Sequence, residues 1–156
     1  RKALSLNNMF LWGQCITLFY LFMYFHMASW TGVLVFFGTA LYGKMYLELI
    51  NYIEHYGLIR IPGKKVEIRH SWNCNTLASC NILYNLPRHT YHHLNAAAPY
   101  WKIKALKKAP ELPYGYLIMI AIALFPPVYK KLMRPHLNNW DQCFASEEEK
   151  NFLTNS

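Results

Sequence analysis

The first third of the chain is apolar, with few interruptions. Residues 9–30 carry no formal charge, and the apolar stretch that follows carries two charges, Lys44 and Glu48, four positions apart, where they can pair on one face of a helix. About twenty apolar residues are needed for a helix to cross the hydrocarbon core of a bilayer. We therefore predict two membrane-spanning helices, over about 9–30 and 33–54, joined by a short turn at Thr31–Gly32.

The rest of the chain mixes short apolar stretches with polar ones. The Pro62–Gly63 pair is a strong turn signal within residues 59–69, which predicts a small β-hairpin. An amphipathic helix is expected to follow as far as Pro87, with a new helix starting after this proline. Residues 114–129 are apolar but short for a span, so we expect an interfacial or partly buried helix there. The polar, acidic end of the chain is expected to be mobile.

Composition narrows the class of protein. Of the 156 residues, 54% are hydrophobic and 15% are charged, and this charged fraction lies well below the roughly 25% of soluble domains. The formal net charge is +8, but the basic residues lie beside the apolar spans, which indicates a membrane surface and not nucleic acid. By the positive-inside rule both ends of the helix pair face the cytoplasm. The four cysteines form no CxxC pair, so we expect reduced thiols.

The strongest candidate for chemistry is a cluster of histidines. Five of the seven histidines lie between residues 55 and 93. His89, His92 and His93 occupy positions i, i+3 and i+4, so three imidazoles on one helix face can point at one spot. Neutral imidazole nitrogens without a nearby cysteine suit iron, zinc, copper or nickel. A polar helix surface that is merely rich in histidine remains the alternative.

Five short strings then point to one family. They are NYIEHYGL at 51–58, HSWN at 70–73, RHTYHH at 88–93, LPYGY at 112–116 and ALFPP at 123–127. In order and approximate spacing, the chain resembles the second half of the integral-membrane alkane 1-monooxygenases, from about Leu4 to about His136. NYxEHYG is the most specific string, because HxxHH alone is shared with membrane fatty-acid desaturases and hydroxylases.

This resemblance implies an all-α membrane protein. The chain would be the C-terminal fragment of a multi-helix transmembrane bundle with a cytoplasmic, histidine-rich helical cap, residues 1–136 forming the hydroxylase-like or desaturase-like part and residues 137–156 a polar tail. The family uses a non-haem di-iron site, O2 and two electrons to place one oxygen atom on the terminal carbon of an alkane. The implied cofactor is two iron ions, and the implied partners are an aliphatic substrate, O2, a rubredoxin-like electron donor and the lipid bilayer.

The resemblance also assigns roles to particular residues. Carried over by motif, the expected metal ligands are His55, His89, His92 and His93. His70 is a further ligand candidate. Glu54 is either a ligand or an acceptor that orients a ligating imidazole, unless it is a helix-end charge paired with Arg60 or Arg88. Hydrogen bonds that support the ligands are expected from Asn73, Asn75, Asn85 and Arg88.

Two departures from the family pattern limit what can be carried over. The last box usually reads LQRHSxHH, whereas this chain has Pro87 in place of glutamine and Tyr91 beside the ligands, so substrate and electron-donor preference are not inherited. No counterpart of the family's earlier boxes, HExxH and EHxxGHH, precedes Asn51. The chain begins at Arg1 without a visible signal peptide. We therefore expect it to be the tail of a longer protein, with half of a metal site and no activity alone.

Three other functions stay open. A membrane desaturase shares the ligand logic but removes two hydrogens from the substrate instead of inserting oxygen. A non-catalytic membrane subunit would keep the helices and lack the first histidine boxes. A single-metal zinc hydrolase is compatible with HxxHH, but the chain has no HExxH glutamate to act as its base.

Overall fold

The computed structural model describes residues 8–154, and within them the fold is helical. No β-strand forms in this range; an isolated parallel bridge joins Asn73 and Glu111. The chain divides into two units, Arg1–Leu47 and Glu48–Ser156, which we call unit 1 and unit 2. The predicted all-α class is therefore confirmed for the described residues.

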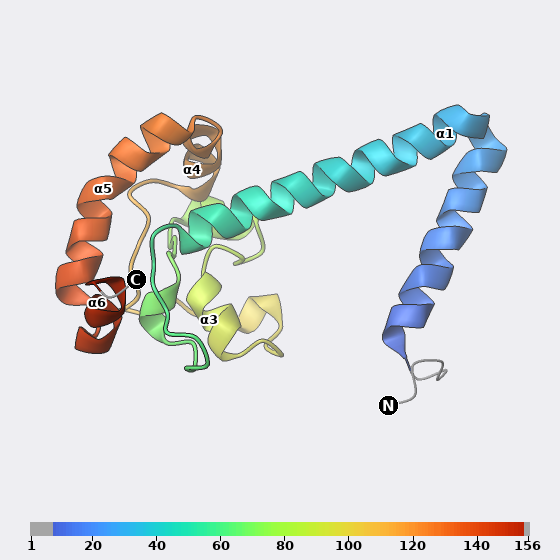
Figure 1. Ribbon diagram of the computed structural model, residues 1–156. Helices are drawn as coiled ribbons and strands as arrows, with labels where there is room; N and C mark the ends of the chain where they lie inside the picture. The colour runs from blue at the N-terminus through green and yellow to red at the C-terminus, as the bar shows by residue number, and fades with distance from the viewer. Residues whose placement is uncertain (1–7, 155–156) are drawn as a thin grey trace. The chain divides into compact units, whose positions relative to one another are not determined.

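Unit 1 consists of most of helix α1, Met9–His55, which is bent rather than straight. Ala28 (φ −142°) and Ser29 (φ 53°) leave the helical conformation, and the ribbon changes direction there (Figure 1). The predicted turn at Thr31–Gly32 is therefore displaced toward the N-terminus. A Cβ on Gly32 would collide with the carbonyl oxygen of Tyr24, so this glycine lets the two arms approach closely.

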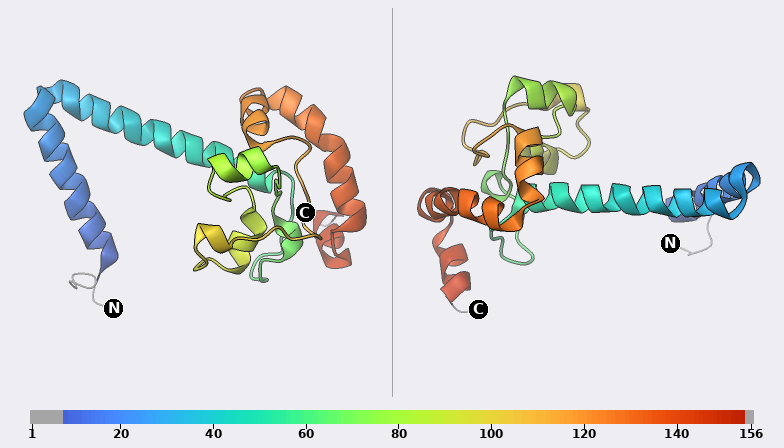
Figure 2. Two further views of the ribbon diagram at one scale, coloured as in Figure 1. Left: turned by 180° about the vertical axis from the view of Figure 1, so that it is seen from behind. Right: turned by 90° about the horizontal axis from the view of Figure 1, so that it is seen from above.

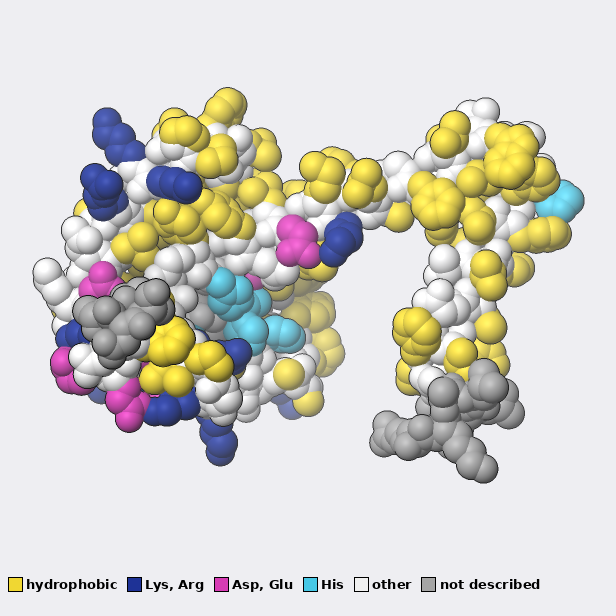
Figure 3. All heavy atoms as spheres, in the orientation of Figure 1, with side chains coloured by type: hydrophobic (Ala, Val, Ile, Leu, Met, Phe, Trp, Pro, Cys, Tyr) yellow, Lys and Arg dark blue, Asp and Glu magenta, His cyan; other side chains and the backbone are white. Residues whose placement is uncertain are grey.

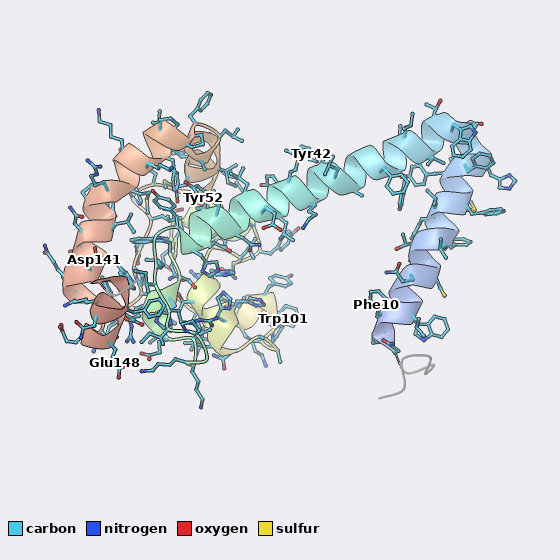
Figure 4. All side chains as sticks on the ribbon, in the orientation of Figure 1. Phe10, Tyr42, Tyr52, Trp101, Asp141 and Glu148 are labelled. Carbon is cyan, nitrogen blue, oxygen red and sulfur yellow. The ribbon has the colours of Figure 1, made fainter. Side chains whose placement is uncertain are left out.

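The surface of α1 is apolar and largely exposed in unit 1. Among the described residues it is the one helix that is long and apolar enough to cross a membrane. Large apolar side chains are exposed along it, including Phe10, Trp30 and Leu34. Hydrophobic side chains cover much of its visible surface in Figure 3, and Figure 4 shows Phe10 pointing away from the helix. The two predicted spans thus form the two arms of one kinked helix, and the length and exposure of its apolar surface indicate membrane association.

Unit 2 packs short helices around the last turns of α1. The elements that follow are η1 (Ile68–His70), α2 (Leu77–Ile82), α3 (His89–Leu94), η2 (Tyr100–Lys102), α4 (Tyr116–Ala123), α5 (Pro126–Cys143) and α6 (Glu147–Thr154). Figures 1 and 2 show α5 and α6 along one side of the unit and α2 and α3 along the other. Between them lies a core of Ile50, Ile53, Trp72, Tyr116, Met119, Tyr129, Met133 and Trp140.

The end of α1 is capped by the segment that contains HSWN. Gly57 has φ +71°, the left-handed conformation that commonly terminates a helix. Trp72 then supplies two donors: its backbone N–H bonds the Glu54 carbonyl at 2.8 Å, and its indole Nε1–H bonds the Tyr56 carbonyl at 2.9 Å. The HSWN string therefore satisfies carbonyls that the helix end leaves unpaired.

The predicted hairpin over residues 59–69 is wrong, although its turn is correct. Lys64 N–H donates to the Ile61 carbonyl at 3.2 Å across Pro62–Gly63, but no strand follows. An isolated two-stranded hairpin is marginally stable at best. Here the end of the segment forms η1 instead, and its side chains bond α6.

The helix start after Pro87 follows the prediction, whereas the helix before it, expected to run as far as Pro87, ends at Ile82. Beyond the end of α2, Tyr84 and Asn85 have φ of 50° and 61°, which no helix interior tolerates. Helix α3 begins at His89, just after the proline. The stretch 114–129 also matches, because α4 is partly buried and ends before Pro126.

The prediction of a mobile C-terminal tail is wrong. Helix α5 continues to Cys143, and α6 begins at Glu147. Trp140 is 0% exposed and Glu149 is 3% exposed. The tail was expected to be mobile because its sequence has no apolar periodicity. Its buried groups are a single tryptophan and a carboxylate, which produce no such pattern.

Candidate metal centre

Three histidines converge in unit 2. His55 comes from the end of α1, and His89 and His93 come from α3. One ring nitrogen of each lies within 4.8 Å of the others, and the ring centroid of His89 is 5.1 Å from that of His55 and 4.3 Å from that of His93. Figure 3 shows histidine side chains gathered on one face of this unit. Part of the predicted cluster is therefore assembled within a single unit.

His92 lies at the edge of this group. It is exposed, its ring centroid is 6.0 Å from that of His89, and it is not one of the three converging side chains. Adjacent residues on an α-helix point about 100° apart. The orientation of the six-residue α3 brings positions i and i+4 toward His55, so position i+3 faces solvent.

In His55 and His89, the ring nitrogen Nδ1 faces an acceptor. His55 Nδ1 lies 3.2 Å from the backbone carbonyl oxygen of His70. His89 Nδ1 lies 3.1 Å from Glu54 Oε2, although the two are not aligned as a hydrogen bond and each otherwise lacks a partner. With Nδ1–H on both rings, the two Nε2 lone pairs face each other at 3.2 Å. Such a pair of acceptors requires a proton or a cation between them.

The separation of these nitrogens fits a single metal ion. Two nitrogens bound to one ion at about 2.1 Å, with an angle of about 90–110°, lie roughly 3.0–3.4 Å apart. The observed 3.2 Å between His55 Nε2 and His89 Nε2 lies in this range. Imidazoles that bind metals through one nitrogen usually donate from the other to a carbonyl or carboxylate, as the positions of the His70 carbonyl and Glu54 allow here. The residues therefore fit a metal.

Burial favours the neutral form of the His89 and His93 imidazoles. Burial, followed by the nearby His93, His55 and His92, lowers the pKa of His89 to about 3. Burial, followed by His55 and His92, also lowers the pKa of His93. Metals bind the neutral form of imidazole, so both side chains are in the ligating form at physiological pH.

Glu54 is the buried carboxylate of the centre. It is 1% exposed, and its Oε1 accepts a hydrogen bond of 2.6 Å from the hydroxyl group of Tyr116. Its other oxygen faces His89, as described above. The predicted pairing with Arg60 or Arg88 does not occur: Arg60 is exposed, and Arg88 Nη1 donates instead to the Ile103 carbonyl at 3.1 Å. Glu54 therefore lies where it can orient His89.

His70 is engaged through its whole imidazole. Nδ1 accepts a hydrogen bond of 2.9 Å from the backbone N–H of Glu67, and Nε2 lies 2.8 Å from Glu149 Oε1. The ring lines an open pocket of about 280 Å³ together with His55 and His93. In this arrangement neither nitrogen of His70 is available to a metal, and its backbone carbonyl serves the centre instead.

Asn73 fixes the start of α3. Its Oδ1 accepts from the Thr90 backbone N–H at 3.0 Å, and its Nδ2 donates to Thr90 Oγ1 at 2.6 Å and to the Ser71 carbonyl at 2.9 Å. The other predicted supporting asparagines bond residues that are not ligand candidates. Asn75 donates to Glu111 at 2.7 Å, and Asn85 donates to the Tyr100 carbonyl at 3.0 Å.

Sequence reasoning missed three residues of the centre. Tyr116 holds Glu54, the fully buried Thr90 anchors α3, and Glu149 binds His70. Tyr116 could have been noticed, because it belongs to the LPYGY string, and Thr90 lies within the histidine box. The signal for Glu149 is weaker: a Ser-x-x-Glu spacing from Ser146 that predicts a helix start.

Several known proteins are similar to this chain. The sequence profile of the fatty acid desaturase family matches residues 1–123. Alkane 1-monooxygenase 2 of Alcanivorax borkumensis is 34% identical over 97% of this chain and 42% of its own length. Alkane 1-monooxygenase 1 of Pseudomonas aeruginosa is 34% identical over 91% of this chain and 38% of its own length. The xylene/toluene monooxygenase hydroxylase component XylM of Pseudomonas putida is 27% identical over 75% of this chain and 32% of its own length.

These matches confirm the resemblance to the alkane 1-monooxygenases that the five strings predicted. The chain spans less than half the length of these curated relatives. The matched profile includes α1, η1 and α3, which carry all three converging histidines and both acceptors that face them. The chain therefore belongs to the fatty acid desaturase family.

Proposed function

We propose that this chain is the C-terminal part of a membrane non-haem di-iron monooxygenase. The enzyme would hydroxylate the terminal carbon of alkanes or related aliphatic chains, using O2 and a reduced electron carrier. The observation that carries this proposal is the convergence of His55, His89 and His93, with an acceptor facing the second nitrogen of two of them. The names of the relatives supply the reaction, since three converging histidines alone suit several chemistries.

The proposed ligands from this chain are His55, His89 and His93. The exposed His92 is one helical position from His93 and would serve a second ion, whose other ligands come from outside these residues. Bound iron supplies the oxygen chemistry that activates a C–H bond, which side chains cannot do. Three or four histidines form only part of a two-iron site, so we expect the chain alone to give no product.

The other residues of the centre orient the ligands. Glu54 Oε2 lies 3.1 Å from His89 Nδ1 and would accept a hydrogen bond from it after a small realignment, and Tyr116 holds Glu54 through the 2.6 Å hydrogen bond. The His70 carbonyl does the same for His55. In this role neither Glu54 nor His70 is a metal ligand. Such acceptors set the tautomer of a ligating imidazole and raise its basicity.

The membrane and the electron donor complete the proposal. The arms of α1 would cross the bilayer, and residues 1–136 would belong to the membrane domain. Basic residues follow α1 in unit 2, including Arg60, Lys64, Lys65, Lys102, Lys104, Lys107 and Lys108. By the positive-inside rule they orient the centre toward the cytoplasm, where a rubredoxin-like carrier has access to it.

A membrane fatty-acid desaturase is the second candidate. The family profile that matches residues 1–123 favours it, because that profile is named for desaturases. The two reactions require the same kind of histidine site and differ in the product. Oxygen enters the substrate in one, and two hydrogens leave it in the other.

Two measurements test the proposed function. In the complete membrane protein, in which this chain continues its natural upstream sequence, octane should give 1-octanol, whereas a desaturated acyl chain as the product would favour the alternative. In the chain alone, anaerobic titration with Co²⁺ should show binding that is abolished by His89→Ala and retained in His26→Ala. His26 is the matched control because it stacks on Phe22 in unit 1, with ring centroids 4.4 Å apart. Absence of both metal binding and product would favour a non-catalytic membrane relative.

A further inference from the structure

The C-terminal segment of unit 2 contacts the metal centre from beyond the region that the family profile matches. The profile ends at residue 123, whereas the contacts come from Trp140 and Glu149. The indole Nε1–H of the fully buried Trp140 donates to the Arg69 carbonyl at 2.8 Å. Arg69 lies immediately before His70, so α5 holds the backbone next to the carbonyl that faces His55.

Glu149 binds the same segment through its side chain. It lies in the first turn of α6, where its Oε2 accepts from the Ser146 backbone N–H at 2.8 Å in a capping box. The same carboxylate lies 2.8 Å from His70 Nε2 and 3.1 Å from Arg69 Nε. Burial alone would raise its pKa, but hydrogen bonds from Ser146, His70 and Arg69 together lower the pKa to about 2. Glu149 is therefore a buried anion that its donors neutralise.

These contacts fix the tautomer of His70. Its Nδ1 accepts from the Glu67 backbone N–H, so Nε2 carries the proton and donates to Glu149. Both ring nitrogens of His70 are bonded, and the backbone carbonyl of the same residue faces His55 Nδ1 at 3.2 Å. That carbonyl can only accept, so His55 must carry its proton on Nδ1 and present the Nε2 lone pair to His89.

We propose that Glu149 is a positioning residue for the metal centre. By holding His70, it holds the carbonyl that sets the tautomer and direction of the His55 imidazole. The proposal rests on the proposed metal-binding function, and it gives α6 a role in preparing the site. A merely structural role would require only that α6 docks on unit 2.

The chain offers variants that separate these two roles. Glu149→Ala removes the acceptor of His70 and the partner of Arg69. Glu149→Gln keeps nearly the same shape but has one acceptor oxygen instead of two, so it can accept from His70 or from Ser146 but not from both. Glu147→Ala is the matched control on α6, because Glu147 is exposed and pairs with Lys150 at 2.8 Å, away from His70.

The first measurement reads the tautomer without any metal. In ¹⁵N-histidine NMR of the metal-free full chain, His55 should carry its proton on Nδ1 in the wild type and in Glu147→Ala. In Glu149→Ala the His55 signals should shift toward a mixture of the two tautomers. An unchanged His55 tautomer in folded Glu149→Ala, with folding verified by circular dichroism, would overturn the proposal.

The second measurement reads the metal. Removal of an outer hydrogen-bond partner typically weakens metal binding by about 10- to 100-fold, so Glu149→Ala should weaken Co²⁺ binding at least about tenfold and shift its visible spectrum. Glu149→Gln, with one acceptor oxygen left, should bind Co²⁺ with an affinity between those of the wild type and Glu149→Ala. Equal affinity and identical spectra for wild type and folded Glu149→Ala would contradict the positioning role. If the wild type binds no Co²⁺ while the tautomer still depends on Glu149, the proposed metal function fails and the positioning of His55 by Glu149 remains.

Discussion

The two units of the chain differ in which side chains they bury. In the described part of unit 1, residues 8–47, Gly32 is the one buried residue, and large apolar side chains face outward. Unit 2 buries a polar set instead: Glu54, His70, Ser71, Asn73, Ser79, His89, Thr90 and Glu149. Unit 1 therefore depends on its surroundings for the burial of apolar surface, and unit 2 depends on internal hydrogen bonds.

This difference follows from what each unit must satisfy. An α-helix pairs its own backbone groups, so a membrane helix needs no buried polar side chains. A metal centre needs imidazoles of fixed orientation, and an unpaired buried polar group costs about 1–3 kcal/mol. Unit 2 meets both requirements through hydrogen bonds between distant segments, such as the one from Asn73 to Thr90. Matched substitutions in the two units should therefore have very different effects.

The largest contrast is expected for tryptophan. Trp140→Ala in unit 2 removes a fully buried side chain and the donor to the Arg69 carbonyl, and should lower the free energy of unfolding by about 3–5 kcal/mol. Trp30→Ala in unit 1, where the side chain is 71% exposed, should change it by less than about 1 kcal/mol. Denaturant unfolding in mild detergent, followed by far-UV circular dichroism, measures both. Equal losses would show that unit 1 has an internal core after all.

A smaller contrast is expected for threonine. Thr90→Val removes a buried hydroxyl that accepts from Asn73 at 2.6 Å and lies 3.3 Å from the Ser71 carbonyl, so unit 2 should lose about 1–3 kcal/mol. Thr39→Val removes a hydroxyl that bonds only carbonyls of its own helix at 2.9 Å and should change stability by less than about 0.5 kcal/mol. Hydrogen exchange of the Trp72 amide, which donates to the Glu54 carbonyl, reads unit 2. Unchanged protection in Thr90→Val would contradict the role assigned to buried polar groups.

The same contrast explains which features the sequence predicts. The helical apolar segments, the helix start after Pro87 and the family resemblance depend on local patterns, and the structure and comparisons agree with them. The bend of α1 lies nearer the N-terminus than the predicted turn, because it depends on the close approach of Gly32 to Tyr24 rather than on a local turn signal. The apolar pattern therefore predicted that unit 1 is helical, but it did not predict where the helix bends.

In the metal centre, local spacing predicts the residues but not their partners. The box spacing placed His89 and His93 together, yet it treated His92 as equivalent, because periodicity does not fix the direction in which a short helix faces. His70 was predicted as a ligand, whereas both of its nitrogens are bonded, one of them to a residue 79 positions away. Contacts over such distances leave no periodic trace in a single sequence.

The glycine substitutions have the smallest single effects, and these effects have opposite signs. Gly57 has φ +71° at the end of α1, and a Cβ there would also strike the side chain of Leu137. Gly57→Ala should therefore destabilise unit 2 by about 1–2 kcal/mol. Gly38 lies within the helical part of unit 1, where a Cβ would meet no atom within 4 Å, so Gly38→Ala should stabilise α1 by up to about 1 kcal/mol.

Thermal unfolding in detergent, followed by far-UV circular dichroism, distinguishes the two signs. The double variant tests independence, since substitutions that share no partner usually add within about 0.5 kcal/mol. If Gly38→Ala destabilised the complete membrane protein but not the chain alone, that glycine would be in contact with a neighbour outside these residues. Its position would then mark where another helix of the complete protein packs on α1, and the exposed surface of unit 1 would belong to a protein interface instead of to lipid.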